Sequence, residues 1–259
     1  MNRVLDFFES AAQKSGTYPM MFLNDKEDGT MLNFNVDTTD NVRLTYQGEV
    51  KSNDIVLHFH TLNNNNPQSN QDLIAFYEAD DSGVVAADVK PLQITPVNRP
   101  LAETDIRVKN VPRQQRSYAF AYVQGCDSDK LQAMPFSKCQ VSSLLALPKN
   151  ASGGPAYNIT LNIQSTGDLV TLSYTGIPHT EPKNAAWVGI WVDQNLDLSK
   201  APAIFYPVTD GGWTGDLQID GLLVNTNYYL GYFLDGYSTS KAKLTMTHQA
   251  AFIRFRTEF

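Results

Sequence analysis

The chain has 259 residues, of which 42% are hydrophobic and 18% are charged. This composition supplies a core and excludes a disordered chain, a coiled coil and a collagen-like repeat. The formal net charge of −7 argues against electrostatic binding of nucleic acid or anionic lipid. No apolar run approaches the roughly 18 residues of a membrane-spanning helix, so we expect one or two globular domains and no transmembrane segment.

Residues 1–16 predict a short N-terminal helix, because Val4, Phe7, Phe8 and Ala11 share one face at helical spacing. Acidic residues interrupt the apolar stretch, so the segment lacks the pattern of a secretory signal. We therefore expect a cytoplasmic protein, although release by a non-standard route would leave no trace in the sequence. We expect this helix to pack on its own domain. The alternative is that it docks on a partner or a membrane.

Cys126 and Cys139 are the only cysteines, and we expect them to flank a hairpin whose turn is residues 127–129. In such a hairpin they lie out of register, which predicts no disulfide between them. Reduced thiols agree with a cytoplasmic location.

Segments of the first half of the chain resemble segments of the second half in the same order and at nearly constant spacing. The matched pairs are 54–57 with 168–171, 73–77 with 187–191, 105–108 with 216–219, and 117–125 with 228–236. Identity is low, so the order of the matches carries the interpretation. We infer two copies of one duplicated module, arranged in tandem.

Each half alternates apolar and polar residues at the period of a β-strand, with turns rich in Asn, Asp, Gly and Pro between the strands. We predict an all-β fold of two tandem immunoglobulin-like β-sandwich domains, at residues 17–147 and 156–259. Residues 148–155 have the composition of a linker. An up-and-down barrel is the alternative architecture.

The second half resembles the SKICH domain, a small immunoglobulin-like β-sandwich. Residues 168–175 are similar to an early strand of that family, residues 187–191 to its Trp-rich core strand, and residues 228–236 to its late Tyr-rich strand. The sequence departs from the family at residues 193–195, where a Gly-Trp segment is absent. SKICH domains are recruitment modules that bind proteins or target membranes, so the resemblance implies binding rather than catalysis.

The tryptophans all lie in the second half of the chain. Trp187 and Trp191 fall on one face of a predicted strand, and we expect at least one of these rings in the core. Trp213 lies in a loop rich in Asp and Gly, where an exposed ring can stack on a sugar or anchor a protein partner. The alternative is that Trp213 folds back and closes the end of the sandwich.

Three further residues complete the predicted binding set with Trp213: Asp210, Asn195 and Tyr237. His58 and His60 project from one face of a strand and have a spacing that suits two ligands of Zn²⁺. A third ligand would have to be His179 or His248 in the other half, or a carboxylate such as Asp54. No ligand-rich pair stands nearby in the sequence, so we expect a solvated strand face and no metal or cofactor. Motifs of nucleophilic, phosphate-binding or dinucleotide-binding enzymes are absent, which predicts that the protein is not an enzyme.

These observations predict a non-catalytic binding protein whose ligand is a protein or a glycan surface. The ligand would contact Trp213 and its neighbours or a cleft between the halves. The alternative is a secreted virulence factor or toxin subunit that acts on a host membrane or receptor. The sequence leaves the oligomeric state open.

Overall fold

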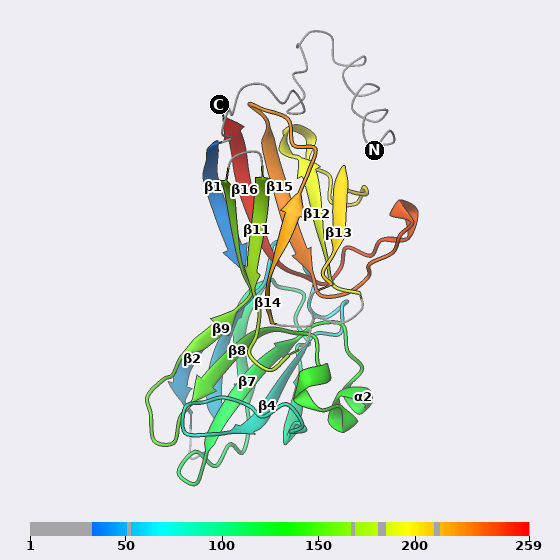
Figure 1. Ribbon diagram of the computed structural model, residues 1–259. Helices are drawn as coiled ribbons and strands as arrows, with labels where there is room; N and C mark the ends of the chain where they lie inside the picture. The colour runs from blue at the N-terminus through cyan, green and yellow to red at the C-terminus, as the bar shows by residue number, and fades with distance from the viewer. Residues whose placement is uncertain (1–32, 51–52, 167–168, 181–184, 210–212, 259) are drawn as a thin grey trace.

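The computed structural model describes residues 33–50, 53–166, 169–180, 185–209 and 213–258. The fold is all-β, as predicted, and its strands form antiparallel sheets that pack as two β-sandwiches stacked end to end (Figure 1). The predicted helix at residues 1–16 lies outside the described residues, so its docking role stays a prediction. Within the described residues, no helix has the length and apolar character needed to cross a membrane.

We call the sandwich in the lower part of Figure 1 the N-terminal sandwich. It consists of a three-stranded sheet packed against a five-stranded sheet. The first sheet has the order β2 (Arg43–Glu49), β3 (Ile55–His60), β6 (Glu103–Val108). The second has the order β5 (Gln93–Pro96), β4 (Leu73–Ala79), β7 (Ser117–Val123), β8 (Val141–Leu147), β9 (Ala156–Asn158). Large buried side chains such as Phe59 and Tyr122 fill the space between the sheets.

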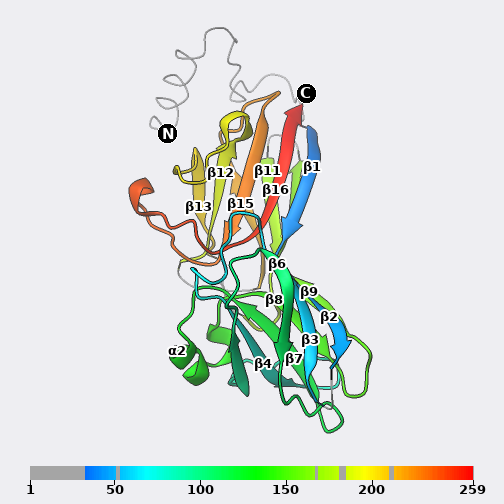
Figure 2. The same cartoon turned by 180° about the vertical axis from the view of Figure 1, so that it is seen from behind.

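The other sandwich, which we call the C-terminal sandwich, has the same arrangement of three strands against five (Figure 2). The three-stranded sheet has the order β10 (Thr160–Thr166), β11 (Leu169–Thr175), β14 (Thr214–Ile219). The five-stranded sheet has the order β1 (Asn33–Asn41), β16 (Gln249–Glu258), β15 (Asn227–Phe233), β12 (Trp187–Val192), β13 (Ile204–Pro207). Tyr174 and Tyr232 face each other across its core.

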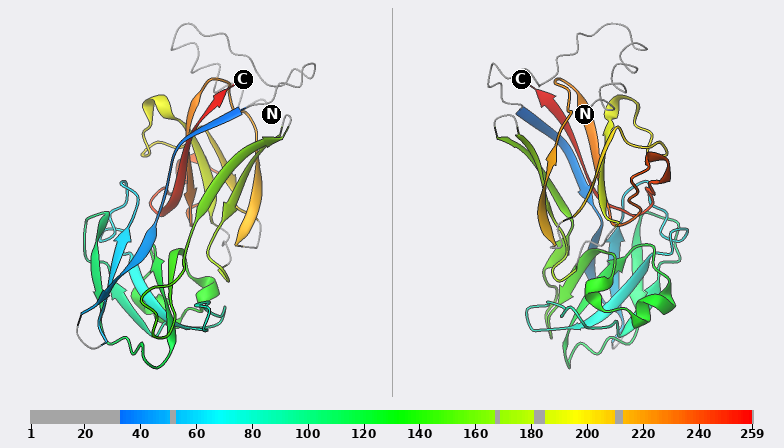
Figure 3. Two further views of the ribbon diagram at one scale, coloured as in Figure 1. Left: turned by 90° about the vertical axis from the view of Figure 1, so that its left-hand side faces the viewer. Right: turned by 45° about the vertical axis from the view of Figure 1, so that its right-hand side comes forward.

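Two strands, one from each half of the chain, belong to the sandwich formed mainly by the other half. β1 pairs with β16 of the C-terminal sandwich, and β9 pairs with β8 of the N-terminal sandwich. The views in Figure 3 show the blue strand β1 running along the C-terminal sandwich, from the end where the C-terminus lies down to the junction, before the chain continues into the N-terminal sandwich. Membership of the sheets therefore does not follow the predicted ranges 17–147 and 156–259, although the domain boundaries themselves stay a prediction.

The five-stranded sheet of the C-terminal sandwich is apolar on both faces. Val188 and Ile190 point into the sandwich, whereas Trp187 and Trp191 point outward and are 0% and 5% exposed. Loop residues, among them Leu244, cover the two rings. The prediction that at least one of these rings is core is confirmed, because both of them are buried.

The predicted hairpin turn at residues 127–129 is wrong. β7 and β8 do pair, but they are connected through the helix α2 (Ser128–Ala133) and the 3₁₀ turn η1 (Phe136–Lys138). The Asp127 carboxylate accepts from the backbone N–H groups of Asp129 and Lys130, so this Asp caps a helix rather than opening a tight turn.

One of the predicted sequence matches is out of step by one residue. The match of 54–57 with 168–171 places Ile55 on Leu169. The inward-facing residues, however, are Ile55 and Leu57 in β3, and Val170 and Leu172 in β11. A shift of one residue exchanges the two faces of a strand, so these strands correspond only when the match is moved by one position.

Candidate functional site

Trp213 lies immediately before β14, at the end of the C-terminal sandwich that meets the N-terminal one. Its carbonyl oxygen accepts a hydrogen bond from Gly176 N at 2.5 Å, which fixes its backbone against the end of β11. Gly176 permits this approach, because a Cβ there would lie 2.9 Å from the Trp213 oxygen. The residue is 41% exposed, so the ring is available to a ligand rather than folded into the core.

Trp213 lines a pocket at the junction of the two sandwiches. The N-terminal sandwich contributes Cys139, Gln140 and Val141. The remaining wall comes from the C-terminal sandwich and consists of Ile159, Tyr174, Gly176, Ile177, Thr180, Ala186, Tyr232 and Leu234. The two places that the sequence offered for a ligand, the Trp213 loop and a cleft between the halves, are therefore one location.

The polar group of most interest in this pocket is the Gln140 side chain. Its Nε2 donates to Asp235 Oδ2 at 3.2 Å, which fixes the orientation of the amide. Its Oε1 is buried, and among the described residues it has no hydrogen-bond partner. A buried acceptor without a donor costs free energy. Gln140 immediately precedes β8, and no local pattern singled it out for the pocket.

Behind the pocket, His248 joins the two sandwiches. Its Nδ1 lies 2.8 Å from Asp235 Oδ1, and its ring lies against Gly125 of the N-terminal sandwich. Burial lowers the pKa of His248, but the hydrogen bond and charge of Asp235, together with the charge of Asp72, outweigh burial and raise the pKa above its usual value. The protonated ring is therefore the form that the junction stabilises.

A second polar cluster secures the N-terminal side of the junction. Asp72 is 1% exposed, and its Oδ2 accepts from Asn65 Nδ2 and from the Tyr122 hydroxyl, both at 2.8 Å. Burial raises the pKa of Asp72. Asn64 reaches across the junction and donates to Gln249 Oε1 at 3.0 Å. Asn64 and Asn65 belong to the loop between β3 and β4, and this loop is part of the contact between the sandwiches.

The contribution of the His248–Asp235 pair to stability depends on pH in a defined direction. A pKa raised by folding means that the pair contributes fully below the unfolded-state value of 6.5 and progressively less as the pH rises through the folded-state value. We expect the free energy of unfolding of the wild type, relative to that of His248→Gln, to fall as the pH rises above the unfolded-state value of 6.5. Urea unfolding followed by circular dichroism measures this difference, and a difference that stays constant with pH would contradict it.

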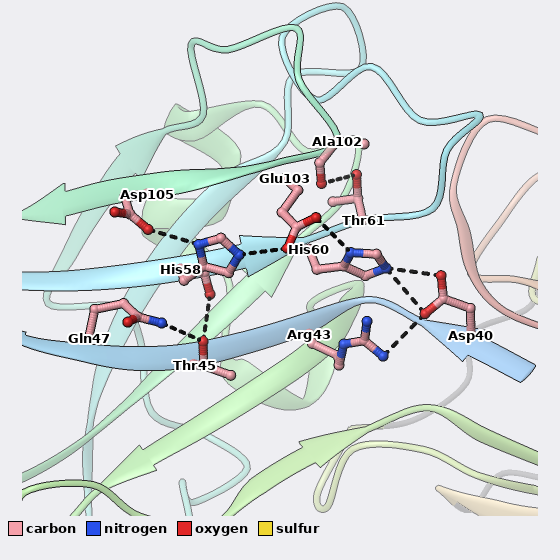
Figure 4. A network of polar contacts seen from close by, with 10 residues as sticks. All are labelled: Asp40, Arg43, Thr45, Gln47, His58, His60, Thr61, Ala102, Glu103 and Asp105. Atoms are coloured by element: carbon pink, nitrogen blue, oxygen red, sulfur yellow. Dashed lines mark hydrogen bonds and ion pairs between the residues drawn. The ribbon is translucent and has the colours of Figure 1, made fainter.

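His58 and His60 project from one face of β3, as predicted (Figure 4). His58 Nε2 lies 2.9 Å from Glu103 Oε1 and its Nδ1 lies 2.8 Å from Asp105 Oδ1. His60 Nε2 lies 2.9 Å from Asp40 Oδ2. In the part of the chain that the structure describes, no group of three or more His, Cys, Asp or Glu residues is placed to hold a metal ion.

The cluster around His58 and His60 behaves as a charged strand face. The hydrogen bonds of His58 to the Glu103 and Asp105 carboxylates raise the pKa of His58, and the bond with His58 lowers the pKa of Glu103. The side chains of both carboxylates are about 60% exposed, so these ion pairs contribute little to stability.

Of the other predicted binding residues, Tyr237 is not among the described residues that line the pocket. Tyr237 is half-buried and its ring packs beside that of Phe205, with centroids 6.3 Å apart. Asn195 is the last residue of η2 (Asp193–Asn195). Asp210 lies outside the described residues. Comparison with protein-family models and with curated proteins found no match to this chain.

Proposed function

We propose that this protein is a non-catalytic recognition protein that binds its ligand at Trp213 and the adjoining pocket. The observation that carries the proposal is that Trp213, an exposed aromatic ring, lines a pocket whose walls come from both sandwiches. Ligand pockets characteristically combine apolar and aromatic walls with a few polar groups, and they occur preferentially where two domains meet.

The lining favours a protein ligand over a glycan. Most of the pocket residues are apolar, and a sugar would leave most of its hydroxyl groups without partners on such a surface. An apolar side chain fits better, because it would pack on Trp213 and on the apolar residues beside it. Exposed Trp residues are frequent anchors at protein interfaces.

The architecture supports the same class of function. We infer that the two sandwiches are copies of one immunoglobulin-like module, since each has a three-stranded sheet facing a five-stranded sheet with corresponding strand order. The resemblance of the second half to SKICH recruitment modules points to binding as well. The proposal does not depend on that family, because it is argued from the pocket.

The test is a ligand screen with a matched pair of variants. A displayed peptide library and a glycan array supply the probes, and each hit is titrated against wild type, Trp213→Ala and Leu92→Ala. Leu92 is an exposed apolar residue that does not line the pocket. We expect Trp213→Ala to weaken binding of peptide hits by about 30-fold or more, as for a hot-spot residue, and Leu92→Ala to leave it unchanged.

Trp213→Ala is expected to fold normally. The corresponding place in the N-terminal sandwich is held by Ala102, whose carbonyl oxygen accepts from Thr61 N at 2.6 Å in the way that Trp213 accepts from Gly176. Hits that bind wild type and Trp213→Ala equally, or a screen without hits, would contradict the proposal. Hits confined to the glycan array would replace the protein ligand by a carbohydrate.

A further inference from the structure

We propose that the two halves of the chain are reciprocally strand-exchanged copies of one module, so that each half is the obligate binding partner of the other. This inference is independent of any ligand at Trp213. It makes the junction an interface of the kind found in a symmetric dimer whose two copies have been joined into one polypeptide.

The exchange is reciprocal in position. β1 is the strand beside β16, which ends the second half, and β9 is the strand beside β8, which ends the first half. Each exchanged strand continues into the opposite sandwich after a single residue. Val42 separates β1 from β2, and Ile159 separates β9 from β10. Both residues are buried, at 0% and 2% exposure, so the chain crosses over inside the protein.

The hydrogen bonds at the crossing repeat one another. Asn41, the last residue of β1, donates through Nδ2 to the Ile159 carbonyl oxygen at 3.0 Å. Asn158, the last residue of β9, donates through Nδ2 to the Val42 carbonyl oxygen at 3.2 Å when its amide is oriented to satisfy its neighbours. Two copies related by a two-fold axis make such paired contacts, in which residue i meets j and j meets i.

Positions farther from the crossing follow the same relation. The bond from Thr61 N to Ala102 O has its counterpart in the bond from Gly176 N to Trp213 O. After β7 and β15, the chain turns at Gly125 and Gly236, whose φ angles of +60° and +86° suit glycine. The two copies differ where Trp213 takes the place of Ala, which is also where the pocket opens.

The exchanged strands contribute packing that neither half can replace. β1 pairs with β16 from Asn33–Glu258 to Asn41–Ala251, and the ring of Phe34 packs edge-on against Phe255 with centroids 5.7 Å apart. Without β1, β16 would become an unpaired sheet edge and would lose this apolar contact. The two halves should therefore remain together even when the covalent link between them is cut.

The experiment cuts the full-length folded protein. A protease recognition sequence is inserted after Ser152, an exposed residue between β8 and β9, and the chain is cleaved under native conditions. We expect the two fragments to elute together at the size of the intact chain and to unfold in one transition. Fragments that separate without denaturant would overturn the proposal.

A disulfide identifies the exchanged strand directly. Asn35 and Arg256 are register partners on β1 and β16, and both are exposed. In the cleavable chain carrying Asn35→Cys and Arg256→Cys, oxidation at high dilution should join the fragments into one band on a denaturing gel without reductant. The two single variants control for the native cysteines. If the double variant folds, as judged by circular dichroism, but its fragments stay unlinked, the assignment of β1 to β16 fails.

Discussion

Replacing Trp187 by Ala is expected to lower the free energy of unfolding by about 3–5 kcal/mol. The ring is 0% exposed and stacks on Phe233 with centroids 4.3 Å apart. Its Nε1 donates to the Asp235 carbonyl oxygen at 2.8 Å. Truncation therefore leaves a cavity on the outer face of the five-stranded sheet and a carbonyl group without its donor.

Trp213→Ala is the matched control for Trp187→Ala, because the same substitution is made at a partly exposed position. We expect its free energy of unfolding to stay within about 0.5 kcal/mol of the wild type. Urea unfolding followed by far-ultraviolet circular dichroism measures both variants. Equal losses for the two would show that Trp213 is structural and would remove the basis for its role in binding.

Gly125→Ala is expected to destabilise the junction by about 2–4 kcal/mol. Gly125 has a φ angle of +60°, where a side chain is strained, and an added Cβ would lie 2.0 Å from Cε1 of His248. The imidazole would have to leave its place beside Asp235. The pH-dependent part of stability that His248 supplies should disappear together with the contact.

Gly153→Ala provides the control, because a Cβ at that position meets no other atom within 4 Å. Its free energy of unfolding should match the wild type to within about 0.5 kcal/mol. Unfolding curves of both variants at two pH values make the comparison. If Gly125→Ala keeps the stability and the pH dependence of the wild type, His248 does not secure the junction in the way described.

Gly125→Ala also bears on binding, because the geometry of the pocket depends on the contact between the sandwiches. Cys139, Gln140 and Val141 form one wall and Trp213 stands in the other, so the pocket exists only while the sandwiches hold their relative position. The polar contacts of His248, Asp235 and Asp72 lie beside this wall. A junction held in this way presents a preformed site and lowers the entropic cost of binding.

The alternation of apolar and polar residues was sufficient to predict several strands and which of their residues share a face. It placed Trp187 and Trp191 together on one face of β12 and His58 and His60 together on one face of β3, and both are found so. Local period decides these features, because successive side chains of a strand point to opposite faces. The exposure of Trp213 agreed with its setting among Gly and Asp residues.

Features that depend on contacts between distant parts of the chain were not predictable in this way. Residues 37–41 are all polar, so the apolar–polar alternation does not reveal that β1 belongs to the opposite sandwich. The choice of β16 as the partner of β1 is made by tertiary packing, such as that of Phe34 on Phe255. The orientation of the Gln140 amide likewise depends on Asp235, which is far away in sequence.

The most direct measurement of the central claim is the mapping of a bound ligand by heteronuclear NMR. A peptide hit from the screen is titrated into ¹⁵N-labelled protein, and the indole N–H of Trp213 and the side-chain amide of Gln140 are followed. We predict that both signals shift in step with binding, since the ligand contacts Trp213 in one wall of the pocket and Gln140 in the other. If the Trp213 and Gln140 signals stay unchanged while signals of residues on another surface shift, the binding site is not at the junction.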